Sequence, residues 1–403
     1  ICWSTSLWPI IQAGLKPVFV DVNLNDFNAS IEEIKLKISK RTKAILLVHV
    51  LGTSSARPAQ GRSVSGSIIE TPEGMLVVDC GEGFQNRLVK HRSEMKNFGG
   101  RRLKMAKVAA ILLTHGHLDH TWGLLPWMQT MSLDGRREKL TIIGPTTTDV
   151  IESIVSSGKL GDIETTQPSD LFNQYRMWMN LGANTETLGY EVDWILGDGS
   201  RWVNLATLET VSLPQPIANV DLSFHSTKHK VPSCAWKISI PPKKGKFNRK
   251  KAQQLPDAVR ATLASGRDVE HEGEELVASE FRGKVRPSMS VIMSGDTAEQ
   301  AIETECDLLI HEATFLNSHT AIAEQHQHST SAGAARTALK CNAKHLALTH
   351  YSARLESPDD SLSEARDLHP SVVALSDGDR IILNEDFTIT HLQKVENGWE
   401  PHN

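Results

Sequence analysis

Short apolar runs of strand length recur along the chain and are separated by polar or amphipathic stretches. The clearest runs cover residues 18–22, 43–50 and 108–113, and all three are rich in the aliphatic residues that buried strands prefer. Between the first two runs, the isoleucines of residues 31–38 fall on one face of a helix. Strands that alternate with helices predict an α/β fold, and residues 18–50 predict a single βαβ unit.

The first 50 residues differ in character from the rest of the chain. The stretch GLKPVFVDVNLNDFNASIEEIKLKISKRTKAILLVHVLG resembles the DegT/DnrJ/EryC1 family of sugar aminotransferases, which use pyridoxal phosphate. The resemblance stops near residue 50, before the family's Schiff-base lysine, so it implies no cofactor-binding residue and no aminotransferase activity here. We expect a fusion or assembly junction at that point, and the alternative is a native extension strand. The chain also starts at Ile1 rather than Met, which favours a truncated or processed reading frame.

Histidines gather directly after the apolar run at residues 108–113. The string THGHLDH contains His115, His117, Asp119 and His120. Loops at strand ends carry the chemistry of α/β layers, and this spacing lets one loop address two metal ions a few ångströms apart. Imidazole and carboxylate ligands suit Zn²⁺. The alternative, a chance group of surface histidines, is disfavoured because so many specified residues rarely coincide.

Other apolar runs also end in histidines or carboxylates. Taken alone, each of these residues could be structural, but the repeated pattern of a strand followed by a ligand predicts that some of them complete the metal site. The candidate ligands are His225, His229, Asp296 and His350. Two further pieces, with His311 and Glu312 and with His328, carry acid–base potential.

The order of the short motifs is specific. LGTSSARP, DCGEGFQ, THGHLDH, SGDT, HEATF, HST and LTHYSAR follow one another as in the ribonuclease Z family, the tRNA 3′-processing endonucleases of the metallo-β-lactamase superfamily, and the chain resembles that family over nearly all of residues 51–403. The resemblance implies an αββα sandwich, two mixed sheets flanked by helices. Residues 67–83 fit its opening hairpin, with a turn near Glu73.

The resemblance also implies a ligand set for two zinc ions, with Mn²⁺ or another divalent ion as an alternative. The first ion would take His115, His117 and His229, the second Asp119, His120 and His350, and Asp296 would bridge them. His229 is preferred to His225 because HKVPSCAW matches the stretch after the family's ligand. We expect Asp79 to orient a ligating histidine from behind, the alternative being a turn residue at a strand end.

Chemistry follows from this centre. A hydroxide shared by two zinc ions can attack the scissile phosphorus at neutral pH. We expect Asp119 to act as the general base, and His328, oriented by Glu312, to protonate the leaving 3′-oxygen. The expected substrate is precursor tRNA, which would lose its 3′ trailer.

The balance of basic and acidic residues limits where RNA can bind. Lys and Arg number 43 against 48 Asp and Glu, so an RNA contact must come from a local patch. Residues 241–287 occupy the position where the family extends a tRNA-binding arm, although the arm's Gly-Pro-rich tip is not recognisable. Its expected RNA contacts are Lys243, Lys244, Lys246, Arg249, Lys250 and Lys251. A second basic cluster runs from Lys90 to Lys107, and either cluster could instead be a solvated face.

The rest of the composition limits location and partners. The five cysteines form no C-x-x-C pair, which favours a reducing, cytoplasmic setting over a disulfide scaffold or a thiolate zinc site. No apolar run approaches the ~18 residues of a membrane span. We expect no membrane or DNA partner, and the resemblance implies a homodimer. Residues 146–219 are longer and less familiar than in compact members, so two alternatives stay open: a small-molecule phosphodiesterase of the same superfamily, with a lactonase or thioesterase behind it, and a catalytically idle RNA-binding homologue.

Overall fold

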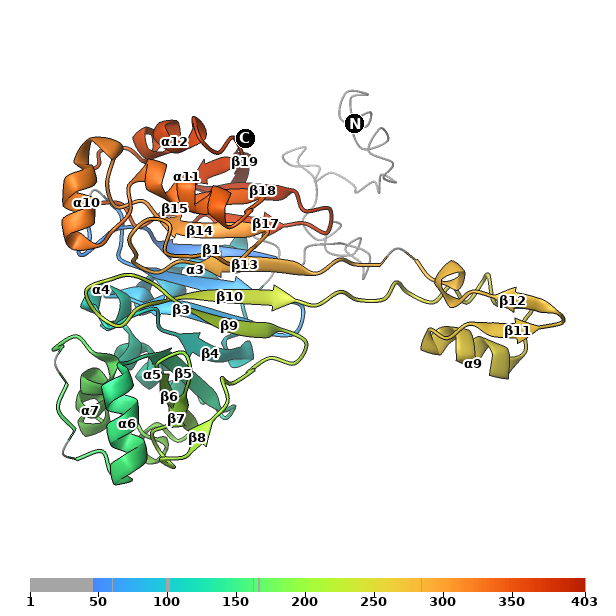
Figure 1. Ribbon diagram of the computed structural model, residues 1–403, viewed down its shortest axis with the longest axis horizontal. Coiled ribbons are helices and arrows are strands. Elements are labelled where there is room, and N and C mark those ends of the chain that lie inside the picture. Colours follow the sequence, from blue (N-terminus) through green and yellow to red (C-terminus); the bar gives the residue numbers. More distant parts are fainter. Residues whose placement is uncertain are drawn as a thin grey trace.

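The computed structural model describes residues 46–402 with the exception of Gln60, residues 99–101, Asp162, Thr166 and Lys284. Within this part the chain folds into two sheets that pack face to face, with helices on both outer faces (Figure 1). The αββα sandwich expected from the sequence is therefore confirmed. The predicted strand at 18–22 and the predicted helix at 31–38 lie outside the described residues.

The larger sheet has eleven strands among the described residues. Their spatial order is β19 (Gly398–His402), β18 (Ile389–Val395), β17 (Arg380–Leu383), β1 (Leu46–Gly52), β2 (Gly66–Glu70), β3 (Met75–Cys80), β4 (Val108–Leu112), β5 (Leu140–Pro145), β6 (Val192–Gly197), β7 (Trp202–Asn204) and β8 (Thr210–Val211). Strands β3 to β6 run parallel to one another, and the remaining neighbours are antiparallel.

Two sequence predictions are confirmed in this sheet. Strand β1 lies between β2 and β17, and all of its residues are buried, so the apolar run at 43–50 does contain an interior strand. Strands β2 and β3 form the predicted hairpin, and its turn is closed by a hydrogen bond from the Thr71 N–H to the Gly74 carbonyl.

The smaller sheet has the order β16 (Val372–Ala374), β15 (His345–Thr349), β14 (Leu308–Glu312), β13 (Met289–Met293), β10 (Cys234–Ile240) and β9 (Asp221–Ser226). Strands β13 to β16 are parallel, whereas β9 and β10 are antiparallel. Both sheets are therefore mixed, as the family resemblance implies.

Helices cover the outer faces of both sheets. The helices that connect strands β3 to β6 of the larger sheet are α3 (Phe84–Asn97), the 3₁₀ helix η1 (Met105–Lys107), α4 (Leu118–Thr121), α5 (Leu124–Leu133), α6 (Thr148–Ser157), α7 (Leu171–Asn180) and α8 (Thr185–Leu188). The smaller sheet carries η3 (Asn317–His319), α10 (Thr320–His326), α11 (Ser331–Lys340) and α12 (Pro358–Arg366). No helix in the described ranges is long and apolar enough to cross a membrane.

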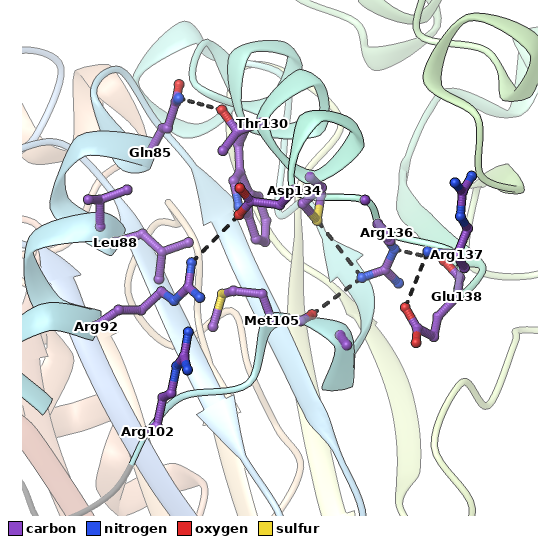
Figure 2. Close-up of a pocket in the computed structure, with 15 residues that line it drawn as sticks. Gln85, Leu88, Arg92, Arg102, Met105, Thr130, Asp134, Arg136, Arg137 and Glu138 are labelled. Carbon is purple, nitrogen blue, oxygen red and sulfur yellow. Dashed lines mark hydrogen bonds and ion pairs between the residues drawn. The ribbon is translucent and has the colours of Figure 1, made fainter. Parts of the chain in front are cut away.

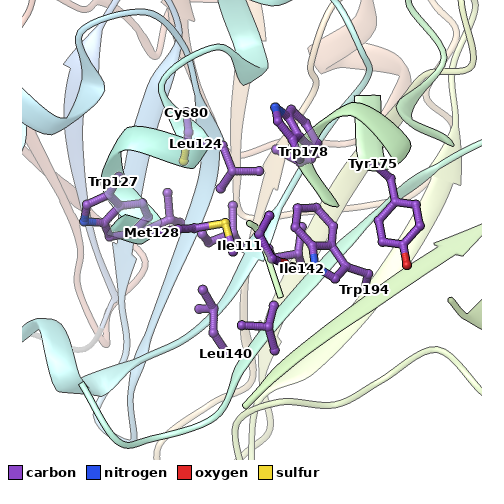
Figure 3. Close-up of a cluster of buried hydrophobic side chains, with 14 of the residues drawn as sticks. Cys80, Ile111, Leu124, Trp127, Met128, Leu140, Ile142, Tyr175, Trp178 and Trp194 are labelled. Carbon is purple, nitrogen blue, oxygen red and sulfur yellow. Dashed lines mark hydrogen bonds between the residues drawn. The ribbon is translucent and has the colours of Figure 1, made fainter. Parts of the chain in front are cut away.

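Alternation along the strands divides the core into layers. In β4, Ile111 packs outward against the helices and Leu112 packs inward against the other sheet, because successive strand residues point to opposite faces. The outer layer is rich in aromatic residues, and Figure 3 shows Trp178 and Tyr175 around Trp194. Residues near the ends of the same strands are thereby held rigidly, which is what a site built on strand ends requires.

Residues between β10 and β13 leave the sandwich as an extended arm (Figure 1). The arm contains α9 (Asp257–Ser265), a hairpin of β11 (Val269–His271) and β12 (Glu274–Leu276), and the 3₁₀ helix η2 (Ala278–Phe281). A small core of its own holds the tip together, with Leu263 and Phe281 buried in it.

Candidate metal centre

Five strand ends meet at one edge of the sandwich. Asp79 lies at the end of β3, residues 114–120 follow β4, Asp296 follows β13, Glu312 ends β14 and His350 follows β15. Because β3 and β4 are parallel, as are β13 to β15, their carboxyl ends lie at the same edges of the two sheets. Residues far apart in the sequence thus become neighbours.

The first group of candidate ligands combines three histidines and one carboxylate. His117 Nδ1 lies 3.0 Å from His115 Nε2 and 3.2 Å from His229 Nε2. His115 Nε2 also lies 3.6 Å from Asp296 Oδ2. The four potential ligand atoms all lie within 4.8 Å of one another, as the ligands of a single ion must.

The second group shares Asp296 with the first. Asp296 Oδ1 lies 3.2 Å from both His120 Nε2 and His350 Nε2, and these two nitrogens are 3.2 Å apart. Asp119 Oδ2 is 3.5 Å from each of them. Asp296 is therefore the one residue that belongs to both groups, and each of its oxygens faces a different set of histidines.

Asp79 holds the imidazole nitrogens of His120 and His115 that face away from the ligand groups, the first directly and the second through Thr114. The Nδ1–H of His120 donates to Asp79 Oδ2 at 2.8 Å. Thr114 Oγ1 also donates to Asp79 Oδ2, at 2.8 Å, so it accepts from His115 Nδ1 at 3.1 Å. Asp79 thus lies behind two candidate ligands, where the sequence places it behind one. Its backbone is left-handed (φ 59°), a strained conformation for a non-glycine residue.

The other two outward nitrogens are fixed in the same way. Thr314 Oγ1 donates to Glu312 Oε2 at 2.5 Å, which leaves it to accept from His350 Nδ1 at 3.0 Å. His229 Nδ1 lies 3.1 Å from the Gln327 carbonyl oxygen and donates to it. In His115, His120, His229 and His350 the outward Nδ1 donates a hydrogen bond, so the inward Nε2 presents a lone pair whenever the imidazole is neutral.

The residues fit divalent cations. Inward lone pairs on neutral imidazoles would repel one another and the carboxylates at about 3 Å unless positive charge lay between them. Asp296 Oδ1 is buried and has no hydrogen-bond partner among the described residues, which is costly for a carboxylate that coordinates nothing. Nitrogen and carboxylate donors in two groups of four suit Zn²⁺ and related transition metals.

The pKa shifts of these residues also fit a site for divalent cations. Burial lowers the pKa of His117 to about 4 and that of His115 well below its usual value, so both are neutral and able to coordinate. Although burial opposes it, the surrounding imidazoles hold the pKa of Asp296 well below its usual range. His120 differs: against the effect of burial, the carboxylates around it, Asp296 foremost, raise its pKa well above normal. A proton on His120 would therefore compete with a metal ion.

His328 and Glu312 form a pair beside the second group. His328 Nδ1 lies 2.8 Å from Glu312 Oε1, and the two rings of His328 and His350 stack with centroids 5.7 Å apart. Burial opposes protonation, but the charge and hydrogen bond of Glu312 raise the pKa of His328 to about 9. Glu312 is itself buried and accepts from the Thr297 N–H at 2.7 Å. His328 is thus protonated at neutral pH and rigidly oriented.

Asp119 is held from the other side. Its Oδ2 accepts a hydrogen bond of 2.7 Å from the Ala56 N–H, in the loop that carries the LGTSSARP motif. Burial opposes ionisation, yet the charge of His120 and a hydrogen bond with His350 keep the pKa of Asp119 below its usual range. The carboxylate is ionised and points at the second ligand group.

Two of the sequence candidates lie apart from the ligand groups. His225 is on β9, with its Nε2 3.3 Å from Ser223 Oγ, and His229 rather than His225 reaches the other ligands, as the sequence predicts. His311 turns away from the groups, because its Nδ1–H donates to the Glu312 carbonyl oxygen at 2.7 Å.

Sequence reasoning missed the residues that hold the loop of residues 114–120, the metal-ligand loop, in place. Gln174 on α7 is buried, donates to the Gly116 carbonyl oxygen and accepts from Thr121 Oγ1 at 2.7 Å. A Cβ at Gly116 would lie 1.7 Å from the Ser169 carbonyl oxygen, so glycine is required for this close approach. The unfamiliar stretch 146–219 therefore packs directly on the loop. A lone Gln in a helix gives no sequence signal of this contact.

The six expected RNA-binding cations lie on the first part of the arm, and all are exposed. Lys251 Nζ is 3.5 Å from Glu280 and lies over the Phe281 ring, and Lys243 Nζ is 4.0 Å from Glu73. The arm leaves the sandwich on the side opposite α4, which directly follows His117 (Figure 1). In one chain these cations are therefore remote from the ligand groups.

Two family profiles match parts of the chain. The profile of the metallo-beta-lactamase superfamily matches residues 59–151, and that of the DegT/DnrJ/EryC1/StrS aminotransferase family matches residues 1–60.

Similar proteins of known name cover most of the chain. Ribonuclease Z of Prochlorococcus marinus (strain MIT 9303) is 30% identical over 347 residues, which are 82% of this chain and 95% of that protein. Ribonuclease Z of Synechococcus sp. (strain CC9605) is 31% identical over 346 residues, covering 82% and 95%. Ribonuclease Z of Methanosarcina mazei is 29% identical over 341 residues, covering 83% and 96%.

Solved structures share the fold. The metallo-beta-lactamase fold protein YhfI from Bacillus subtilis superposes with a TM-score of 0.52 at 19% identity, over 83% of this chain and 98% of that one. A long form RNase Z from yeast gives a TM-score of 0.51 at 17% identity, over 96% of this chain and 47% of that one.

Proposed function

The chain belongs to the ribonuclease Z family, and on this premise we propose that it is a zinc-dependent endoribonuclease that cleaves the 3′ trailer from precursor tRNA. The observation that carries the proposal is the pair of four-atom ligand groups that share Asp296. Two ions so joined are the usual arrangement for displacement at a phosphodiester.

We assign His115, His117 and His229 to one zinc ion, Asp119, His120 and His350 to the other, and Asp296 to both. Ions bound there would supply Lewis acidity, which makes water more acidic and neutralises charge on the phosphoryl oxygens. Asp119 is ionised and lies in the second ligand group. Its carboxylate can orient the attacking water or accept a proton from it.

His328 is the proposed proton donor. Cleavage breaks the bond between phosphorus and the 3′-oxygen of the tRNA, and that oxygen must gain a proton to leave as a hydroxyl. Glu312 engages Nδ1 of His328, so the proton to be given is the one on Nε2. The pKa of about 9 keeps this proton in place at neutral pH. The trailer leaves with a 5′-phosphate.

For the substrate, we propose that the six cations Lys243, Lys244, Lys246, Arg249, Lys250 and Lys251 bind tRNA phosphates. Because the arm extends away from the ligand groups of its own chain, we also propose a homodimer, in which the arm of one subunit serves the centre of the other.

The test compares two substrates on the same metal-loaded protein: a 3′-extended precursor tRNA, and bis-p-nitrophenyl phosphate. The proposal expects cleavage of the RNA to a 3′-hydroxyl tRNA and a 5′-phosphorylated trailer, mapped by end-labelling. Hydrolysis of the small diester without RNA cleavage would favour a small-molecule phosphodiesterase. Tight RNA binding with neither reaction would favour an idle RNA-binding protein.

A further inference from the structure

Arg92 and Arg102, two residues of the second basic cluster, line a cavity that the proposed reaction does not use. The cavity measures about 590 Å³ and lies between α3, α5 and η1 (Figure 2). Helix η1 precedes β4, whereas the metal-ligand loop follows β4, so the cavity and the ligand groups lie at opposite ends of that strand. A volume of this size is typical of small-molecule sites.

Two helices shape the cavity with matching faces. On α3 the lining residues are Gln85, Leu88, Val89 and Arg92, and on α5 and its C-terminal cap they are Trp127, Thr130, Met131 and Asp134. Both sets follow the i, i+3, i+4, i+7 spacing of a single helix face. The two faces are bridged by a hydrogen bond from Gln85 Nε2 to Thr130 Oγ1, and both of these residues line the cavity (Figure 2).

One wall of the cavity is apolar. Leu88 and Met131 are buried beneath it, Met105 closes it from η1, and Val89 is 55% exposed beside it. An apolar side chain left exposed next to a concavity is suited to a flat apolar ligand body.

Arginines line another part of the wall. Arg92 reaches in from α3 and Arg102 from the segment before η1, so that two guanidinium groups point into one space (Figure 2). Arg92 is paired only loosely with Asp134, at 3.9 Å, and Arg102 makes no hydrogen bond or ion pair within the described part of the chain. Two like charges brought together in this way are stabilised by an anion between them.

The charge of the lining limits the ligand. Four guanidinium groups, those of Arg92, Arg102, Arg136 and Arg137, face two carboxylates, Asp134 and Glu138, which leaves an excess of two positive charges. Arg136 is committed to structure, because it donates to the carbonyls of Val108 and Lys139. A phosphate monoester carries about two negative charges, while a triphosphate would meet repulsion from the carboxylates.

We propose that this cavity binds a nucleoside monophosphate, with its phosphate between Arg92 and Arg102 and its base against Val89 and Met105. The site is separate from the metal centre, and its occupation does not depend on the reaction proposed above.

Isothermal titration calorimetry of the full-length, metal-loaded protein with AMP tests the proposal. AMP should bind more tightly than adenosine, inorganic phosphate or ATP. The double substitution Arg92→Ala with Arg102→Ala should weaken AMP binding at least ~10-fold, because both charge-assisted forks are lost. Lys90→Ala is the matched control: it removes a cation from an exposed position of the same helix that does not line the cavity, and should leave AMP binding unchanged.

Val89→Glu places a negative charge on the apolar wall at an exposed position, where folding is not at stake, and should also weaken AMP binding. Hydrolysis of bis-p-nitrophenyl phosphate should stay at its parental rate in every variant and should not be inhibited by AMP at concentrations that fill the cavity. AMP affinity that survives the double substitution, or inorganic phosphate that binds as tightly as AMP, would overturn the proposal. A parent protein that binds no AMP would also overturn it. If the double variant then lost affinity for precursor tRNA, the two arginines would be RNA contacts.

Discussion

Asp296 couples the two ligand groups, because its oxygens face different sets of histidines. Asp296→Asn keeps the shape of the side chain and removes its charge, so it should lower the metal content from about two ions per chain to one or none, and abolish cleavage. Elemental analysis of the purified variant measures this. Asp307→Asn, a carboxylate at the start of β14 that holds Ser290 and Lys344 instead, should keep its metal. Full metal content in Asp296→Asn would rule out a bridging role.

His328 should affect one step only. His328→Ala is expected to slow precursor tRNA cleavage by ~10²–10⁴-fold at unchanged metal content, because the leaving 3′-oxygen loses its proton donor. Hydrolysis of bis-p-nitrophenyl phosphate should change little, since p-nitrophenolate leaves without a proton. His225→Ala, a histidine outside the ligand groups, is the control. An equal loss on both substrates would contradict the assignment.

The same residue predicts a pH dependence. The acid form of His328 is the active one, so the rate of precursor tRNA cleavage should fall as the pH rises through the His328 pKa of about 9. Bound cations repel the proton, so they would shift this fall in rate to a lower pH. The small diester should lack this alkaline limb, and so should His328→Ala on either substrate. If the rate of the parent enzyme fell at the same alkaline pH on both substrates, a group other than His328 would cause the fall.

Among the elements, α7 acts on the metal-ligand loop from outside. Gln174→Ala removes both hydrogen bonds to that loop and should weaken metal affinity ~10–100-fold, as loss of a supporting contact behind metal ligands does. Competition with a chelator measures this, and excess zinc should restore the maximal rate. Asn173→Ala on the same helix loses contacts only within residues 165–173 and serves as the control. Unchanged metal affinity in Gln174→Ala would make α7 a mere cover of the sheet.

The arm is an element whose charge can be tested apart from its fold. Replacing Lys243, Lys244, Lys246, Arg249, Lys250 and Lys251 by Ala should raise KM for precursor tRNA and flatten its dependence on salt, because fewer counterions are released on binding. Hydrolysis of bis-p-nitrophenyl phosphate should not change. Replacing the exposed Glu272, Glu274 and Glu275 of the same arm by Gln should instead leave KM unchanged or lower it. Parental KM in the six-residue variant would make the cluster an ordinary solvated surface.

For the molecule as a whole, we propose that the aminotransferase-like residues 1–50 are dispensable as a unit, except for the part that enters β1. Strand β1 is paired on both sides, by β2 and β17, so a chain beginning at Lys43 retains the strand that the sheet needs. This shorter chain should fold and cleave precursor tRNA like the full chain, measured by thermal unfolding and by the same cleavage reaction. Insolubility of the shorter chain alone would mean that the removed residues pack as part of the domain.

The sequence by itself determined the residue types of the metal centre and the order of the strands that carry them. That was possible because each candidate ligand follows directly on an apolar run, as His115 follows residues 108–113, and because strand patterns are local. The fold class and the ribonuclease Z resemblance, both confirmed, rest on the same short motifs.

Only the tertiary structure decided which atoms meet. The nitrogen that each histidine turns inward depends on partners distant in the chain, such as Asp79 for His120 and Thr314 for His350. The support of Gly116 by Gln174 and the cavity between Arg92 and Arg102 likewise join separate segments. Such contacts arise from the packing of helices on sheets, and the spacing of residues along the chain holds no record of them.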